Sequence, residues 1–98
     1  MIVSFADTGT EDLFEGRNTK ASRRLLPQAL WKLAGKKLEH LDSAEALKDL
    51  RVPPGNRLEA LKGDGAGQHS IRINQQYRIC FRWAEQGPVD VEVVDYHD

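Results

Sequence analysis

The stretch 68–97, QHSIRINQQYRICFRWAEQGPVDVEVVDYH, decides the fold that this sequence predicts. Apolar and polar residues alternate along it, and the apolar set is rich in β-branched and aromatic side chains. A side-chain period of two with this composition is typical of half-buried β-strands. The polar breaks at 74–76 and 85–88 are short, so they predict antiparallel hairpins and not helical crossovers.

Alternation also assigns the two faces of the predicted sheet. One face is apolar and consists of Ile71, Ile73, Tyr77, Ile79, Phe81, Trp83, Val89, Val91 and Val93. The other face carries Arg72, Arg78 and Arg82, so we expect the sheet to display arginines on its open side. Directly after the last strand comes an Asp-Tyr-His trio at 95–97, three groups that can donate or accept protons.

Length and composition fit one soluble domain spanning 1–98. The 98 residues suffice for a single modest core, and 40% hydrophobic with 30% charged residues is ordinary for a globular protein. No apolar run approaches the roughly 20 residues needed to span a bilayer. The first residues lack the basic segment and long apolar region of a secretory signal. We therefore expect a cytoplasmic protein without a membrane segment.

Charge is segregated along the chain although the formal net charge is only −1. Residues 1–15 carry four acids and no base, and 84–98 carry five acids and no base. The middle, 16–83, holds all fourteen Lys and Arg against six acids. Such a pattern is typical of an anion-binding face. The alternative is that these blocks interleave in three dimensions and give a mixed surface.

The sequence offers no credible metal or cofactor site. A single cysteine, Cys80, excludes an internal disulfide and a thiolate metal cluster. The histidines His40, His69 and His97 are scattered, without acids or thiols at ligand spacing. Cys80 shares the parity of Arg78, which places it near the arginine face, but a cysteine in a strand is more often inert packing.

The first half of the chain predicts mostly helices. A short strand is expected over 1–5, then a short helix capped near Asp7 and ended by Gly16, then a basic connection over 17–24. Apolar residues spaced by three and four predict the longest helix, with a stripe of Leu26, Leu30, Leu33, Ala34, Leu38 and Leu41. A short helix over 43–50 should follow.

The segment between these helices and the hairpins contains a loop and one more strand. The Pro-Pro-Gly run in 52–56 predicts a loop, and 57–62 is expected to be a strand or a strand-like segment. The glycines of 63–67 form a turn and not a phosphate-binding P-loop, because a strand follows where that motif needs a helix. The predicted fold is α+β: an N-terminal strand and two to three helices packed on a mainly antiparallel four- to five-stranded sheet.

The residue types that remain suit the cleavage of RNA by its own 2′-hydroxyl. The substrate supplies the nucleophile, so the protein needs no covalent group and no cofactor. It must orient the hydroxyl, remove its proton, stabilise charge on the phosphorane and protonate the leaving 5′-oxygen. Arginines, a terminal Asp-Tyr-His and Glu59 can share that work.

Several motifs together carry a resemblance to a known family. They are Met-Ile-x-Ser-Phe at the start, Pro-Pro-Gly-Asn-Arg-Leu-Glu in the loop, LEALKGD at 58–64, QHSIRIN at 68–74, YRICF at 77–81 and VDYH at 94–97. With these motifs nearly the whole chain resembles the HigB branch of the RelE-type toxins. The resemblance implies a RelE-like fold and the toxin of a bacterial type II toxin–antitoxin module, a ribosome-dependent endonuclease that cleaves mRNA in the ribosomal A site.

The same resemblance implies the partners. A HigA-like helix-turn-helix antitoxin from the same operon should neutralise the toxin. The toxin itself should act on the ribosome and mRNA, and reach operator DNA only through the antitoxin complex.

Roles for individual residues also follow from the resemblance. Arg78 resembles the family arginine at the scissile phosphate, and Asp95, Tyr96 and His97 match the catalytic C-terminal trio. His97 is the first choice for proton transfer, because an imidazole titrates near neutral pH. The alternatives are purely structural: His97 belongs to a frayed terminus without a role, Tyr96 fills a hydrophobic gap, and Asp95 only ends the strand. Alternation from the last strand gives His97 the parity of Val93 and Asp95, which predicts that His97 enters a groove beside Arg78 and that Tyr96 points the other way with Val94.

A further set of basic residues is expected to bind RNA: Arg57, Lys62, Arg72 and Arg82. For Lys62 a solvated turn is the alternative. The chain departs from the pattern at Glu59, where some relatives rely on a histidine; glutamate can act as a base but not as a cationic donor. Weak cleavage follows as the second functional hypothesis: a ribosome-binding toxin that impairs translation or ribosome assembly with weak or no mRNA cleavage.

Overall fold

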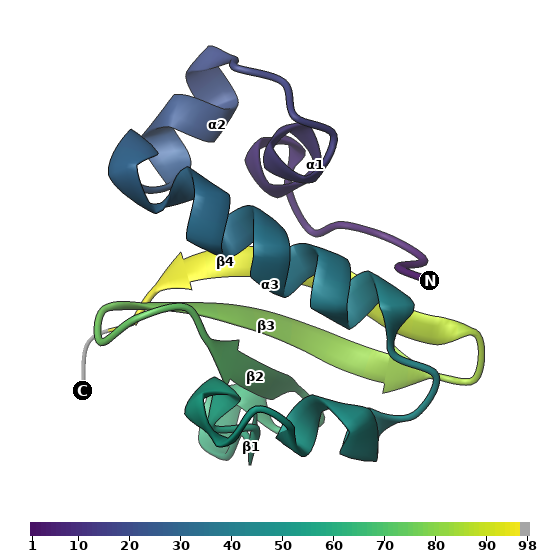
Figure 1. Ribbon diagram of the computed structural model, residues 1–98. Helices are drawn as coiled ribbons and strands as arrows, with labels where there is room; N and C mark the ends of the chain where they lie inside the picture. The colour runs from purple at the N-terminus through teal and green to yellow at the C-terminus, as the bar shows by residue number, and fades with distance from the viewer. Residues whose placement is uncertain (97–98) are drawn as a thin grey trace.

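A four-stranded antiparallel sheet forms one layer of the structure, a computed structural model that describes residues 1–96 (Figure 1). Its strands, in the order β1-β2-β3-β4, are β1 (Glu59–Ala60), β2 (His69–Arg72), β3 (Tyr77–Ala84) and β4 (Gly87–Asp95). Each strand pairs with the next one along the chain, so both hairpins predicted from the alternation are confirmed. The predicted α+β class, with helices packed on an antiparallel sheet, is confirmed as well.

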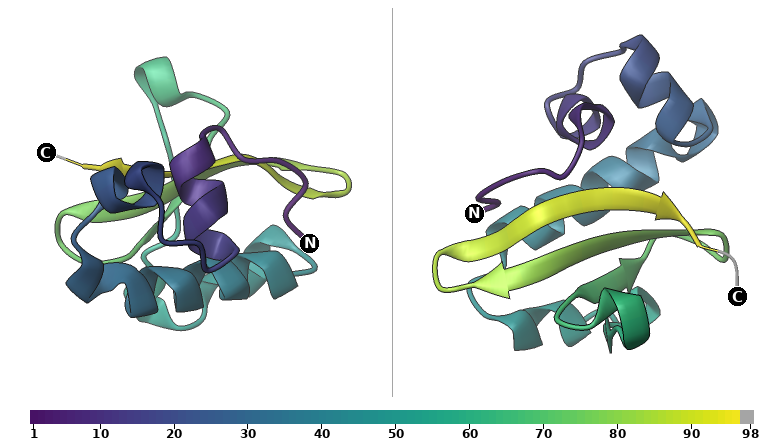
Figure 2. Two further views of the ribbon diagram at one scale, coloured as in Figure 1. Left: turned by 90° about the horizontal axis from the view of Figure 1, so that it is seen from above. Right: turned by 180° about the vertical axis from the view of Figure 1, so that it is seen from behind.

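Helices occupy the other layer. The α-helices are α1 (Thr8–Phe14), α2 (Lys20–Leu25) and α3 (Trp31–Ser43). Within residues 1–96 there are also four short 3-10 turns: η1 (Gln28–Leu30), η2 (Leu47–Arg51), η3 (Pro54–Asn56) and η4 (Gly63–Gly65). Figure 2 shows α3 lying across one face of the sheet and η4 standing on the opposite side. None of the helices within 1–96 is long and apolar enough to cross a bilayer.

The core lies between α3 and the apolar face of the sheet. Ile71 pairs with Ile79, and Ile79 with Val93, so three strands present buried side chains in one row. Leu38 and Leu41 of α3 are fully buried against this row. Burying a Leu or Ile side chain contributes about 1.5–3 kcal/mol, so this layer is what holds the sheet and α3 together.

Three local predictions were wrong, each for a physical reason. The 17–24 connection contains α2, because Thr19 caps it: its hydroxyl accepts from the Ser22 N–H and the Ser22 hydroxyl accepts from the Thr19 N–H. The long helix begins at Trp31 and not at Leu26, because η1 intervenes after Pro27. The short helix near 43–50 is the 3-10 turn η2, which begins only at Leu47.

The N-terminal segment does not form the expected strand. It makes one parallel bridge, Phe5 with Val91, supported by hydrogen bonds from Val91 N–H to Ser4 O and from Ala6 N–H to Val91 O. Directly afterwards Asp7 caps α1 by accepting from the Thr10 N–H at 2.6 Å. The helix therefore starts before a ladder can extend, and the sheet keeps four strands.

Candidate active site

Arg78 on β3 lies at the centre of the candidate site, and neighbouring oxygens fix its guanidinium. The residue is only 7% exposed. Its Nε donates to the Ser70 hydroxyl at 2.8 Å, and its Nη2 donates to the Arg57 carbonyl oxygen at 2.7 Å. Both acceptors are neutral, so they orient the guanidinium without cancelling its charge.

The loop that supplies the Arg57 carbonyl is itself held in place. Asn56 is fully buried and donates to the Leu50 carbonyl oxygen at 3.1 Å, and the ammonium of Lys37 donates to its side-chain oxygen. Arg57 then takes a left-handed conformation with φ +46°, which is uncommon for a residue other than glycine. This turn directs the Arg57 carbonyl toward Arg78.

A cavity of about 400 Å³, which we call the arginine cavity, opens beside Arg78. Six residues line it: Arg57, Glu59, Arg72, Gln75, Arg78 and Tyr96. The sequence predicts five of them as site residues. Gln75 was missed, because a polar residue in a predicted hairpin turn carries no signal that separates it from a solvated one.

Two arginines stand directly opposite each other in this cavity. Arg72 and Arg78 are cross-strand partners between β2 and β3, and Arg72 is oriented by its own Nε, which donates to the Asn74 carbonyl oxygen at 3.0 Å. Like charges in this relation are destabilising. The one described carboxylate in the lining, that of Glu59, comes only to 4.0 Å from Arg78 Nη2 and is half exposed. The arrangement is therefore suited to an added anion.

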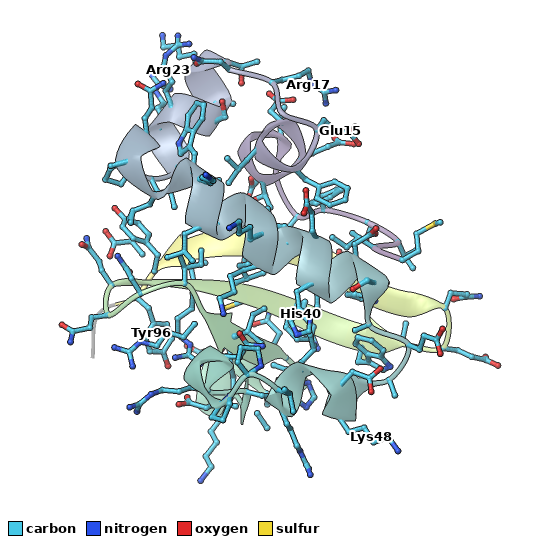
Figure 3. The ribbon with its side chains drawn as sticks, in the orientation of Figure 1. Glu15, Arg17, Arg23, His40, Lys48 and Tyr96 are labelled. Carbon is cyan, nitrogen blue, oxygen red and sulfur yellow. The ribbon has the colours of Figure 1, made fainter. Side chains whose placement is uncertain are left out.

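Tyr96 covers Arg78 from the end of β4. The guanidinium carbon of Arg78 lies 5.7 Å from the Tyr96 ring centroid, within range of a cation–π contact. The Tyr96 N–H donates to the Gln76 carbonyl oxygen at 2.6 Å, so the backbone is anchored to the β2–β3 turn. Figure 3 shows Tyr96 at this end of the sheet.

The predicted orientation of Tyr96, away from the groove beside Arg78, was wrong. Arg78 pairs with Val94, so the face of Val94 and Tyr96 is the one that reaches the cavity. Asp95 pairs with Tyr77 and does not line the cavity; its carboxylate accepts from the Gln76 side-chain amide at 3.2 Å. The prediction for His97 falls outside the described residues.

Two predicted RNA-binding residues lie apart from the cavity lining. Arg82 is exposed, and its Nη1 donates to the Ala66 carbonyl oxygen at 3.5 Å. Lys62 is exposed at the start of η4. Figure 3 shows Arg17 and Arg23 near α1 and α2 at the top of the view, away from Tyr96 at the end of the sheet.

Cys80 is buried on β3, two residues after Arg78. Burial, with the nearby Glu92 carboxylate adding to it, raises the pKa of the Cys80 thiol to about 11, although Arg78 acts in the opposite direction. A thiol with this pKa is neutral at physiological pH and is a poor nucleophile. Its position is that of a packing residue.

A second concave site, which we call the η2–β1 groove, has a volume of about 410 Å³. Its lining combines three apolar residues, two cationic ones and a histidine, and consists of Leu47, Lys48, Arg51, Leu58, Ala60 and His69. The His69 ring is stacked near Phe81, with centroids 6.2 Å apart, and its Nδ1 is buried without a hydrogen-bond partner in the described part of the chain.

The family of the chain is decided by a match over nearly its whole length. A family model described as the RelE-like toxin of type II toxin–antitoxin system HigB matches residues 3–97. The chain belongs to the HigB-like toxin family. It is the toxin of a toxin–antitoxin system, as the resemblance of its motifs implied.

Individual relatives agree with the family. The chain is 42% identical over 85 residues to Toxin HigB-1 of Vibrio cholerae serotype O1, covering 87% of this chain and 86% of that protein. It is 36% identical over 72 residues to an uncharacterized protein of Haemophilus influenzae, covering 74% of this chain and 70% of that protein. Both alignments span most of each protein, so the likeness concerns the whole domain.

Two solved structures share the fold at low sequence identity. The YoeB–YefM complex from Staphylococcus aureus gives a TM-score of 0.60 at 16% identity and covers 100% of this chain and 99% of that chain. The YoeB/ParE toxin from Agrobacterium tumefaciens gives a TM-score of 0.50 at 20% identity, and the match covers 99% of this chain and 98% of that chain. The HigB-like toxin therefore has the same α+β arrangement as these toxins.

In this HigB-like toxin the cavity is equipped to bind a phosphate. Three guanidinium groups and one carboxylate line it, so its local charge is positive although the whole chain carries −1. Arginine matches phosphate oxygens with two parallel N–H donors. Glu59 can accept a proton, and the Tyr96 ring offers a face on which a base can stack.

Proposed function

We propose that this toxin is a ribosome-dependent mRNA endonuclease whose arginine cavity holds the scissile phosphate. The observation that carries the proposal is the pair of facing arginines, Arg72 and Arg78, with Arg78 oriented by neutral oxygens and its charge left for a ligand. A phosphorane gains negative charge over its ground state, so fixed guanidinium groups stabilise it more than the substrate.

The remaining groups supply the proton transfers. The substrate 2′-oxygen attacks phosphorus, the bond from phosphorus to the 5′-oxygen breaks, and the products are a 2′,3′-cyclic phosphate and a 5′-hydroxyl. Glu59 takes the 2′-hydroxyl proton, and His97 gives a proton to the leaving oxygen. Tyr96 stacks on a neighbouring base, and Asp95 orients the C-terminal segment through the Gln76 amide.

The toxin is proposed to have the partners of its family. A HigA-like helix-turn-helix antitoxin from the same operon holds it inactive in the cytoplasm, and contact with operator DNA runs through the antitoxin. The structural neighbour from Staphylococcus aureus, a YoeB–YefM complex, supports a protein partner for a toxin of this fold. Purification from cells carrying the native operon should recover the antitoxin in a stable complex, and recovery of the toxin alone would contradict this proposal.

A second candidate function is supported by the lining itself. Among the described lining residues there is no imidazole, and Glu59 does not offer a cationic donor at neutral pH. The toxin would then bind the ribosome and impair translation or ribosome assembly with weak or no cleavage.

One assay separates the two functions. Purified toxin is incubated with an mRNA that is free or bound in the A site of programmed ribosomes, and the product ends are identified. Cleavage only with ribosomes, leaving cyclic phosphate ends, is the expected result. His97→Gln, which keeps hydrogen bonding but cannot become cationic, should lower the rate by roughly a hundred- to ten-thousandfold. Ribosome binding with intact mRNA would favour the second function.

A further inference from the structure

Helix α3 reaches the loop that supplies the Arg57 carbonyl. Leu38 and Leu41 of this helix are fully buried in the core that it shares with the sheet, so the helix is a rigid support. Lys37 and His40 lie one turn apart on α3, and both donate hydrogen bonds to the loop before β1. Figure 3 shows His40 between α3 and the turns that precede β1.

The two donors of α3 hold the loop at two points. His40 Nε2 donates to the Val52 carbonyl oxygen at 2.9 Å, which requires the proton to be on that nitrogen. The ammonium of Lys37 donates to the side-chain oxygen of Asn56. Within residues 1–96 no carboxylate forms an ion pair with Lys37, so its charge serves this one amide oxygen.

Asn56 passes the constraint on to the backbone. Its side chain is fully buried, and its amide nitrogen donates to the Leu50 carbonyl oxygen at 3.1 Å. A buried polar atom that loses its partner is costly, so the position of Asn56 depends on Lys37. The next residue, Arg57, has φ +46°, a conformation that persists only where the surrounding structure enforces it. The anchored Asn56 enforces it from one residue away.

The series of contacts ends at the guanidinium of Arg78. Its Nη2 donates to the Arg57 carbonyl oxygen at 2.7 Å, and its Nε donates to the Ser70 hydroxyl at 2.8 Å. A guanidinium held at two nitrogens has one orientation, whereas a guanidinium with one acceptor can turn about the remaining hydrogen bond. The orientation of Arg78 therefore depends on the Arg57 carbonyl, and through it on Lys37.

We propose that Lys37 is a positioning residue for RNA cleavage, which holds the Arg57 carbonyl in place so that Arg78 meets the phosphate in one orientation. The inference rests on the proposed function, because it gives Lys37 a role in that reaction. Lys37 does not line the arginine cavity, so it acts on the substrate only through other residues.

This role predicts which kinetic constant changes. Arg78 keeps its charge when Lys37 is replaced, so the cavity still attracts the phosphate. Stabilisation of the phosphorane is lost, because it requires the donors at defined positions. The loss therefore belongs in kcat and not in KM.

The test removes the donor and keeps the rest of the side chain. Lys37→Met retains the length of the chain without the ammonium, and Lys36→Met, at an exposed position of the same helix, is the matched control. Cleavage on mRNA-programmed ribosomes is measured at a temperature at which circular dichroism shows each variant folded. Lys37→Met should lower kcat by roughly 10- to 100-fold, with KM within about twofold of the wild type. The control should match the wild type in both constants.

A double-mutant cycle separates positioning from a general loss of stability. In the Arg78→Lys background the guanidinium that Lys37 positions is absent, so Lys37→Met should lower kcat further by less than about twofold. Hydrogen exchange gives an independent reading. The amides of Asn56 and Arg57 are hydrogen-bonded within the loop, and both should exchange faster in Lys37→Met, whereas the amides of β3 should not.

A second variant is available in case Lys37→Met does not fold. Lys37→Gln ends one bond earlier and leaves room for a water molecule that satisfies Asn56, and the same kinetic results are expected.

The outcomes that contradict the inference are distinct. A wild-type kcat in the Lys37 variant, or unchanged exchange at Asn56 and Arg57, would overturn it. An equal loss in both backgrounds would also overturn it, because Lys37 would then not act through Arg78. A change in KM alone would replace it with a contact between α3 and the ribosome. If the wild type itself cleaves no mRNA on ribosomes, the proposed function falls and the inference falls with it.

Failure of the inference alone has its own signature: the wild type cleaves, and Lys37→Met cleaves equally fast.

Discussion

Arg78 combines burial with a charge that, among residues 1–96, pairs with a carboxylate only at the long distance of 4.0 Å, that of Glu59. Its hydrogen bonds go to the Ser70 hydroxyl and the Arg57 carbonyl, and Glu59 stands at 4.0 Å. An unpaired buried charge costs several kcal/mol, and an ion pair within the fold is the usual remedy. In the function that we propose, the phosphate that enters the cavity supplies the missing partner, so part of the stability of the free toxin is given up for binding.

The shape of the Arg78 side chain should therefore matter as much as its charge. We expect Arg78→Lys to lower ribosome-dependent cleavage by roughly a hundred- to a thousandfold, as for the loss of one transition-state donor. An ammonium cannot reach Ser70, Arg57 and the phosphate together in the fork geometry of a guanidinium. Arg82→Lys is the control, because Arg82 lies outside the cavity. Unchanged cleavage in Arg78→Lys would show that only the charge is needed, and equal losses in the two variants would show that the effect is not specific to the cavity.

Cys80 predicts a pH dependence of stability at the alkaline end. Its pKa in the folded protein is about 11, against 9.0 for the ordinary thiol. Above pH 9 the unfolded chain loses this proton first, so the contribution of Cys80 is fully present below pH 9 and is lost as pH rises toward 11. Urea midpoints measured from pH 8 to 11 should fall less steeply for Cys80→Ala than for the wild type. If the urea midpoints of the two proteins fell in parallel with pH, the raised pKa of Cys80 would be contradicted.

At the scale of elements, the sequence predicts best where one face of an element is buried. The hairpins follow from the alternation that ends in buried Ile79, Phe81 and Val91, and the body of α3 from the spacing of Leu38 and Leu41. Where no such face exists, the prediction fails. Helix α2 buries only Ser22, so it has no apolar periodicity from which a helix could be predicted. Only its capping residues indicate that a helix begins there.

The candidate site shows a second limit of sequence reasoning. Arg72 and Arg78 are placed correctly, because alternation fixes both on one face of adjacent strands. The orientation of Tyr96 is predicted wrongly, because it depends on the register between β3 and β4. Arg78 pairs with Val94, and this register brings Tyr96 and not Asp95 to the cavity. The contacts of Arg78 with the Arg57 carbonyl and the Ser70 hydroxyl could not be predicted either. The alternation of side chains says nothing about backbone groups, and a serine in a strand has no distinctive spacing.

The junction of α1 and α2 depends on one carboxylate and should weaken in acid. Asp12 accepts from the Thr19 hydroxyl at 2.7 Å and from Arg17 Nε at 2.9 Å. These hydrogen bonds, that of Thr19 first, hold the pKa of Asp12 below its ordinary value of 3.8. The contribution is therefore present above about pH 3.8 and is lost as pH falls through the lower folded pKa.

Thermal unfolding between pH 2 and 6 measures this contribution. The wild type should lose stability more steeply than Asp12→Asn below pH 4, because the amide cannot be protonated in this range. Glu11→Gln, an exposed change on the same helix, is the control and should follow the wild type. An Asp12→Asn curve with the same acid slope would contradict a role for this carboxylate.

At the scale of the whole molecule, charge is arranged as separate basic sites on a nearly neutral chain. The net charge is −1, the arginine cavity holds three arginines, and Figure 3 shows Arg17 and Arg23 at the top of the view, away from Tyr96. The basic face that the charge segregation favours stays a prediction. If the toxin acts on mRNA as we propose, long-range attraction to RNA is weak in a nearly neutral molecule, and affinity comes from the few phosphates that enter the cavity.

This arrangement predicts a shallow salt dependence of RNA engagement. If about three arginines each neutralise a phosphate, the slope of log affinity against log salt should be near −2, using about −0.7 per contact for single strands. Affinity for mRNA-programmed ribosomes should then fall by roughly 16-fold between 50 and 200 mM salt. Arg72→Gln should reduce the slope by about 0.7, whereas Arg23→Gln on α2 should leave it unchanged. A steeper slope that Arg23→Gln reduces would mean that the α2 margin also contacts RNA, and the cavity would no longer account for binding alone.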